Sequence, residues 1–232
     1  MRKGFAFPQG FYKGVGALNR IFSPDNLFFR TLARCVDVVG LSLLWLLLCF
    51  PVVTIGPATA ALYHALCRVF HFHEEEGAFG LFFRSLKTNL KQGILATLIL
   101  VPFGVLLYFL HGIYTAAVVA EVSGSTMAYM YFLLLLIIPV GLVCWLFPLL
   151  GRFHFSLPSL FLTALRLLVA HIPTTLLLVA LTVILYLISS YWLIFSFVAP
   201  GLWAVCAAPL LERAFAKHME ADEPEGDQAQ EP

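Results

Sequence analysis

The chain has 232 residues, of which 61% are hydrophobic and only 12% are charged, and its formal net charge is +1. A soluble globular domain has about 25% charged residues, so this chain has too few polar side chains to cover a water-facing surface. The composition excludes a soluble globular protein and predicts a membrane domain, with the lipid bilayer as partner and no nucleic acid.

Residues 1–35 predict a cytoplasmic amphipathic segment that ends in a helix at the membrane surface. Ser23 before Pro24 is a helix start signal. Apolar side chains then recur at helical spacing, at Phe28, Phe29, Leu32 and Cys35. Such a helix lies at the interface and leads into the first span.

Six apolar segments follow, and they predict an all-α, multi-pass transmembrane bundle of about six helices over residues 36–211. A membrane span needs about 20 residues, and the first two segments are shorter than that. These two form either two short full crossings, which we favour, or a re-entrant hairpin covered by protein. The predicted spans are 36–50, 57–72, 93–111, 129–150, 172–188 and 191–211.

The 14 Lys and Arg residues lie before the first segment, around the connections between the second and third and the fourth and fifth, and after the sixth. Because Lys and Arg are retained on the cytoplasmic side, both termini are predicted to be cytoplasmic in the cell membrane. The final stretch "MEADEPEGDQAQEP" is acidic and free of aromatic residues. Residues 212–232 are therefore predicted to be a disordered cytoplasmic tail.

The stretch "PVVTIGPATAALYHAL" (51–66) contains the turn between the first two segments. Pro51 and Pro57 have no backbone N–H, and Pro57 disfavours a helical Gly56, so Pro57 fits the first position of the next helix. The N–H groups at that helix start allow a second interpretation, a site for an anionic or hydroxylated group. The candidate functional residues here are Thr54, Gly56, Pro57, Thr59, His64 and Arg68.

His64, Arg68 and His71 follow at helical spacing and form a polar stripe on the second short helix. Ionisable groups inside a membrane are candidates for a functional site. Arg68 and His71 also lie near the predicted cytoplasmic end of the span, where their side chains can reach the aqueous interface without any site. The stripe is therefore either a site or an interfacial anchor.

Residues 79–91 predict an amphipathic helix, because apolar and basic side chains each recur at helical spacing. Such a helix either lies on anionic headgroups or docks onto a partner protein. The sequence leaves both interpretations open. The candidate docking residues are Phe79, Phe82, Phe83, Arg84, Lys87, Asn89 and Lys91.

Sequence motifs for catalysis are not found, and polar residues do not visibly converge at one membrane depth. The stretch "HFHEEE" (71–76) has no second cluster of ligands, so it predicts a solvated loop. We therefore expect no enzyme, no cofactor and no metal.

The run 51–66, followed by "FFRSLKTNLKQG" (82–93), resembles the YesL-like family of bacterial integral membrane proteins, a domain of unknown function. Ser42 stands in "LSLLW" (41–45), where that family often has an asparagine. The resemblance implies a multi-pass protein of the cytoplasmic membrane, often encoded beside sugar ABC transporter components, and it carries over no catalytic residues.

We therefore expect an accessory or regulatory component of carbohydrate uptake that contacts an ABC permease or its ATPase. The alternative is a small autonomous transporter or channel for a solute. Its path would be lined by the turn at 54–57 and by His64 and Arg68.

Overall fold

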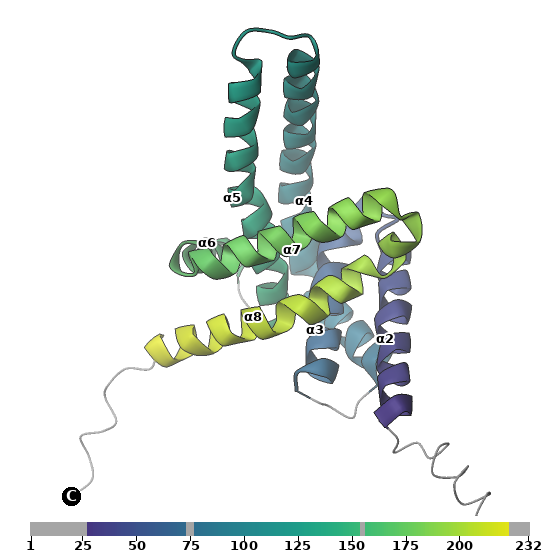
Figure 1. The fold of residues 1–232 in the computed structure, drawn as a ribbon. Helices are drawn as coiled ribbons and strands as arrows, with labels where there is room; N and C mark the ends of the chain where they lie inside the picture. The colour runs from purple at the N-terminus through teal and green to yellow at the C-terminus, as the bar shows by residue number, and fades with distance from the viewer. Residues whose placement is uncertain (1–26, 73–76, 154–155, 223–232) are drawn as a thin grey trace, which may run out of the picture.

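The computed structural model describes residues 27–72, 77–153 and 156–222. Over these ranges the chain is all-helical (Figure 1). The N-terminal segment before residue 27, the four residues 73–76 and the tail after residue 222 lie outside the described residues. The elements are α2 (Leu27–Leu48), η1 (Val52–Thr54), α3 (Ile55–Phe70), α4 (Ala78–Val119), α5 (Ser125–Arg152), α6 (Leu157–Ala170), α7 (Ile172–Tyr191), η2 (Leu193–Phe197) and α8 (Ala199–Asp222).

The C-terminal part of α4 and the N-terminal part of α5 form a hairpin that projects from a body, and the remaining turns of both helices belong to that body with the other helices (Figure 1). α4 alone has 42 residues, which corresponds to about 63 Å at 1.5 Å per residue. The predicted interfacial helix at 79–91 and the predicted span at 93–111 are therefore two parts of one continuous helix. Large apolar side chains cover the projecting part, where Tyr108 is 74% exposed and Phe109 is 64% exposed.

Four helical segments are long and apolar enough to cross a membrane by length and composition: Val52–Phe70, Ala78–Val119, Ser125–Arg152 and Ile172–Tyr191. They coincide with the second to fifth predicted spans. The exposed apolar side chains of the hairpin fit this assignment, because a water-soluble surface rarely exposes so large an apolar area. The coarse prediction of an all-helical membrane protein is confirmed, whereas the number of crossings stays a prediction.

Helix α3 lies at the centre of the body and contacts α2, α4, α5 and α8. Its surface is rich in alanine, and Ala58, Ala60, Ala61 and Ala65 are fully buried. Small residues let helix backbones approach closely, which is how many membrane helices pack. The alanine run after the turn therefore makes α3 the helix around which α2, α4, α5 and α8 assemble.

The closest approach of α3 and α4 is made by two glycines, Gly56 and Gly93. A Cβ on Gly93 would lie 2.7 Å from the backbone N of Pro57, and a Cβ on Gly56 would lie 2.7 Å from the carbonyl oxygen of Gly93. The Gly56 N–H donates a hydrogen bond of 3.0 Å to Thr97 Oγ1. The two sequence runs that carry the family resemblance are thus joined by this crossing.

A second close crossing joins α2 to α8 at Ser42. Ser42 is fully buried, and its Oγ donates to the Val38 carbonyl oxygen at 2.6 Å while it accepts the N–H of Gly201 at 3.0 Å. The Gly201 N–H belongs to the first turn of α8, where backbone donors lack partners within the helix. Ser42 therefore has a polar structural role, as a cap for the start of α8.

The C-terminal boundaries of the prediction need correction. The predicted span 191–211 is interrupted by η2, and α8 begins only at Ala199. α8 also continues past residue 212 to Asp222, and its Glu212 and Phe215 are buried. The predicted tail therefore began too early, because residues 212–222 belong to α8.

Candidate functional site

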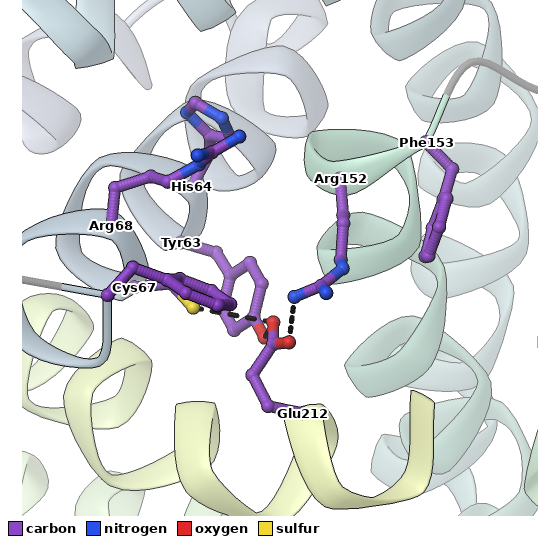
Figure 2. Close-up of a pocket in the computed structure, with 8 residues that line it drawn as sticks. Tyr63, His64, Cys67, Arg68, Arg152, Phe153 and Glu212 are labelled. Atoms are coloured by element: carbon purple, nitrogen blue, oxygen red, sulfur yellow. Dashed lines mark hydrogen bonds and ion pairs between the residues drawn. The ribbon is translucent and has the colours of Figure 1, made fainter. Parts of the chain in front are cut away.

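A polar cavity of about 230 Å³ lies between α3, α5 and α8 (Figure 2). Four charged or titratable side chains line it together with a tyrosine, a cysteine and two phenylalanines. The lining residues are Tyr63, His64, Cys67, Arg68, Phe72, Arg152, Phe153 and Glu212. This is a small space, below the roughly 300–1,000 Å³ of pockets for drug-sized ligands.

Glu212 is the most deeply placed charge of this cavity, with only 6% of its side chain exposed. Its Oε2 forms an ion pair with Nη1 of Arg152. Its Oε1 accepts hydrogen bonds from the Tyr63 hydroxyl at 3.1 Å and from Cys67 Sγ at 3.4 Å. Both carboxylate oxygens are therefore satisfied inside the protein, as a buried charge requires.

The guanidinium of Arg152 is held by aromatic rings as well as by the carboxylate. Its Cζ lies 5.3 Å from the ring centroid of Phe72, 5.6 Å from that of Phe153 and 5.9 Å from that of Phe215. Cation–π contacts within about 6 Å are attractive, and more so where water is excluded. The rings therefore fix the position of Arg152 at the end of α5.

The glycine before Arg152 brings α5 onto α3. A Cβ on Gly151 would lie 2.6 Å from the carbonyl oxygen of Ala60, so this approach requires the absence of a side chain. One turn before Arg152, Pro148 and the fully buried Leu149 continue the packed face. The stretch "PLLGR" (148–152) thus places Arg152 beside α3.

Of the four charged or titratable side chains named first for this cavity, two were predicted as candidates from the sequence and two were not. His64 and Arg68 were candidates because they are ionisable groups in an apolar helix. Arg152 was taken only as a marker of topology, and Glu212 was placed in the tail. The signal that could have found Glu212 is its position between apolar residues at helical spacing, Leu211 and Phe215, because an acidic group on an apolar helix face needs a buried partner.

The expectation that polar groups do not converge at one depth is wrong for this cavity, since tyrosine, cysteine, arginine and glutamate meet there. Their arrangement is that of a closed network. Nucleophilic catalysis needs a nucleophile activated by an available base, and the carboxylate that Cys67 contacts is already neutralised by Arg152. Among the described residues, no group of three or more His, Cys, Asp and Glu is placed to hold a metal ion.

The turn residues Thr54, Gly56 and Pro57 serve the fold. Thr54 Oγ1 donates to the carbonyl oxygens of Leu48 and Pro51, at the end of α2. The Gly56 N–H donates to Thr97, so this one donor of the helix start is not available to an external anion. α3 begins at Ile55, which places Pro57 in its first turn but not at the first position that the sequence predicted.

Thr59 lies at a second, apolar cavity of about 470 Å³ between α2, α3, α5, α7 and α8. Its Oγ1 accepts the indole N–H of Trp45 at 3.0 Å. On another wall, Thr182 Oγ1 accepts the indole N–H of Trp203 at 2.9 Å. The polar atoms of both tryptophans are thereby satisfied, and the cavity surface that remains is almost wholly apolar. Tyr63 lines this cavity as well as the polar one.

The candidate docking residues of α4 divide between two faces. Phe82 is fully buried, and Asn89 is buried with its Nδ2 donating to Ser85 Oγ at 3.2 Å. These two do not belong to a surface, which corrects the predicted set. The exposed members, which we call the α4 strip, are Phe79, Phe83, Arg84, Lys87 and Lys91.

Comparison with known proteins adds a family match over part of the chain. No curated protein and no solved structure matches it. The matching segment runs from α2 into the projecting part of α4, so it includes the Gly56 and Gly93 crossing but neither Arg152 nor Glu212. Residues 38–109 match the family described as "Protein of unknown function, DUF624".

Proposed function

We propose that the chain is a non-enzymatic accessory or regulatory protein of the cell membrane that docks, through the α4 strip, onto a subunit of an ABC-type carbohydrate uptake system. The observation that carries the docking is the division of α4 into a buried face and an exposed aromatic and basic face. The carbohydrate context comes from the resemblance to the YesL-like family alone. The closed network around Glu212 supports the non-enzymatic part of the proposal.

The α4 strip is held rigidly by the opposite face of its helix. Phe82 packs in one core cluster with Leu41, Leu62 and Leu66, and the Phe79 ring lies against Gly40 of α2. Phe83 on the outer face is 44% exposed. A fixed aromatic group is a good interface anchor, because little conformational entropy is lost when it binds.

The charge of the strip defines the partner. Arg84, Lys87 and Lys91 are all exposed and give the strip three positive charges. The matching partner surface presents carboxylates beside an apolar patch, on the same side of the membrane. Such complementarity controls both partner choice and the association rate.

The test is affinity purification of the tagged protein from its native membrane in mild detergent, with partners identified by mass spectrometry. A double variant, Phe83→Ala with Lys87→Glu, removes the anchor and reverses one charge. The matched control is Leu106→Ala with Arg166→Glu, which changes two exposed residues outside the strip. We expect the wild type and the control to retain a permease and an ATPase, and the strip variant to lose them.

Recovery of the protein alone would contradict the proposal. In that case, flotation of the purified protein with anionic vesicles, lost in the strip variant, would assign the strip to lipid headgroups. Retention of the partners by the strip variant would also contradict it, because the docking would then use another surface.

A second function, a small autonomous transporter, is favoured by Tyr63, which lines both cavities. His64 lines the polar cavity with it, and Thr59 lines the apolar cavity. A path through the body would pass this ring. The transporter hypothesis predicts solute flux in proteoliposomes, and it predicts that Tyr63→Ala changes the rate of this flux. If a tested solute shows no flux, that solute is excluded as the transported one.

A further inference from the structure

The apolar cavity of about 470 Å³ extends along one face of α7. The residues that α7 contributes to its wall are Thr182, Leu185, Tyr186 and Ser189. They recur at i, i+3, i+4 and i+7, which is the spacing of one helix face over two turns. Thr182 and Ser189 are about 10 Å apart along the helix at 1.5 Å per residue. A cavity of this length suits an extended chain better than a compact ring.

Three hydroxyl groups of the wall are already engaged within the protein. Thr59 and Thr182 each accept an indole N–H, and each donates to a carbonyl oxygen of its own helix. The Tyr63 hydroxyl donates to Glu212. The lining side chains that the structure describes include no charged group. A ligand of this cavity therefore binds through apolar contact, because a buried polar group without a partner is costly.

The cavity reaches the apolar outer surface of α7. Tyr186 lines the cavity and is nevertheless 70% exposed. Around Tyr186 this surface is apolar, with Val183, Ile184 and Leu187 about half exposed. α3, α5 and α7, which all contribute to the wall, belong to three of the four segments that are long and apolar enough to cross a membrane. The medium outside the opening is therefore lipid hydrocarbon rather than water.

One end of the cavity lies close to the C-terminal end of α7, where exposed aromatic residues indicate the edge of the bilayer. Tyr191 is 85% exposed and Trp192 is 71% exposed. Tyrosine and tryptophan are enriched at membrane interfaces. Ser189 and Ser196 line the cavity at this end, and the Thr182 end lies about two turns deeper. A chain that enters from the interface thus has its polar end near water and its apolar end inside the protein.

We propose that the apolar cavity binds one acyl chain of a membrane phospholipid, whose headgroup stays at the interface beside Ser189 and Ser196. An apolar cavity stays free of water and accepts apolar ligands. The walls of an empty cavity lose dispersion contacts, and a chain supplied by the bilayer restores them. The α4 strip contributes nothing to this cavity, so the proposal does not depend on the docking function.

The experiment titrates the full-length protein, delipidated in an uncharged maltoside detergent, with dioleoyl phosphatidylcholine, and native mass spectrometry counts the lipids bound per protein. This headgroup has no net charge, so binding reports the chain. The variants Val143→Phe and Ser189→Phe fill the cavity from opposite ends, because Val143 lies next to Cys144, whose Sγ is 3.5 Å from Thr182 Oγ1. The matched control is Val183→Phe, which adds the same ring at an exposed position of α7 outside the cavity wall.

We expect the wild type and Val183→Phe to bind one phosphatidylcholine per protein. Each filling variant should bind it about tenfold more weakly or less, because the added ring and the chain cannot share the space. Added lipid should raise the apparent Tm of the wild type and of the control, since a ligand stabilises the folded state that it binds. It should leave the Tm of the filling variants unchanged.

Oleic acid is the second probe, and it separates a phospholipid from a free fatty acid. Binding of oleic acid without binding of phosphatidylcholine would overturn the proposal. Failure to bind phosphatidylcholine would overturn it as well. So would lipid binding that a filling variant with a cooperative unfolding transition does not weaken, because the chain would then lie on the outer surface and not in the cavity.

Discussion

Replacing Gly93 with alanine should separate α3 from α4 and destabilise the body. The added Cβ would lie 2.7 Å from both N and Cβ of Pro57 and 2.8 Å from its Cα. Carbon atoms in contact prefer about 3.5–4.0 Å, so the helices would have to move apart by about 1 Å. Backbone atoms of a proline cannot turn aside as a flexible side chain can, and the helices themselves must shift.

This movement has two costs and one gain. Overpacking costs about 1–3 kcal/mol, and loss of the bond from the Gly56 N–H to Thr97 Oγ1 leaves a buried donor, at about 1–3 kcal/mol. Alanine has a better helix propensity than glycine by about 1 kcal/mol. The net destabilisation is about 3 kcal/mol, which lowers the apparent Tm by about 6–12 °C for a chain of this size.

The assay is thermal unfolding of the purified protein in detergent, followed by circular dichroism. The matched control is Gly104→Ala in the same helix, where a Cβ meets nothing within 4 Å. This control gains helix propensity without a clash, so its Tm should stay constant or rise by up to about 4 °C. If Gly93→Ala is as stable as Gly104→Ala, the close crossing described here is not present in the folded protein.

Three further predictions concern the polar contacts and the topology. Thr97→Val should destabilise the protein by about 1–3 kcal/mol because it leaves the Gly56 N–H without an acceptor, whereas Thr97→Ser should retain most of the wild-type Tm; equal Tm values for the two variants would contradict this role. Gly201→Ala should lower the Tm, since its Cβ would lie 2.9 Å from the Val38 carbonyl oxygen, and a normal Tm would show that α8 does not cross α2 at this point. Reporter fusions at Glu121 and at the C-terminus should give signals from opposite sides of the membrane, and signals from the same side would overturn the predicted topology.

Hydropathy was sufficient to predict the four segments that are long and apolar enough to cross a membrane, because their apolar runs are long. It also placed the turn after α2, where Thr54 bonds to Leu48 and Pro51. Hydropathy could not predict that the interfacial helix at 79–91 and the third span at 93–111 form one continuous helix. The composition changes from amphipathic to apolar at Gly93, which predicts a change from the membrane interface to the bilayer. The helix α4 continues across this position without a break.

The polar cavity was predictable only in part, because its members are brought together from distant parts of the chain. The hydrogen bond from Tyr63 to Glu212 joins residues 149 positions apart, and no local spacing encodes such a contact. His64 and Arg68 could be found because both lie on one helix. The buried state of Glu212 depends on Arg152, and neither residue is unusual until the other is placed beside it.

The separation between contacting residues also sets an order for folding during synthesis. The α4 and α5 hairpin contains only residues 78–152, so its two arms can meet while the ribosome is still adding the rest of the chain. The body cannot close at that stage, because Gly201 and Glu212 have not yet been synthesised. These two residues are the hydrogen-bond partners of Ser42 and Tyr63. Until α8 is made, the Tyr63 hydroxyl on α3 and the Arg152 guanidinium on α5 lack the Glu212 carboxylate that they contact in the folded protein. The last helix to be synthesised is therefore the one that completes the core, and an early chain end would leave an inserted hairpin beside an open body.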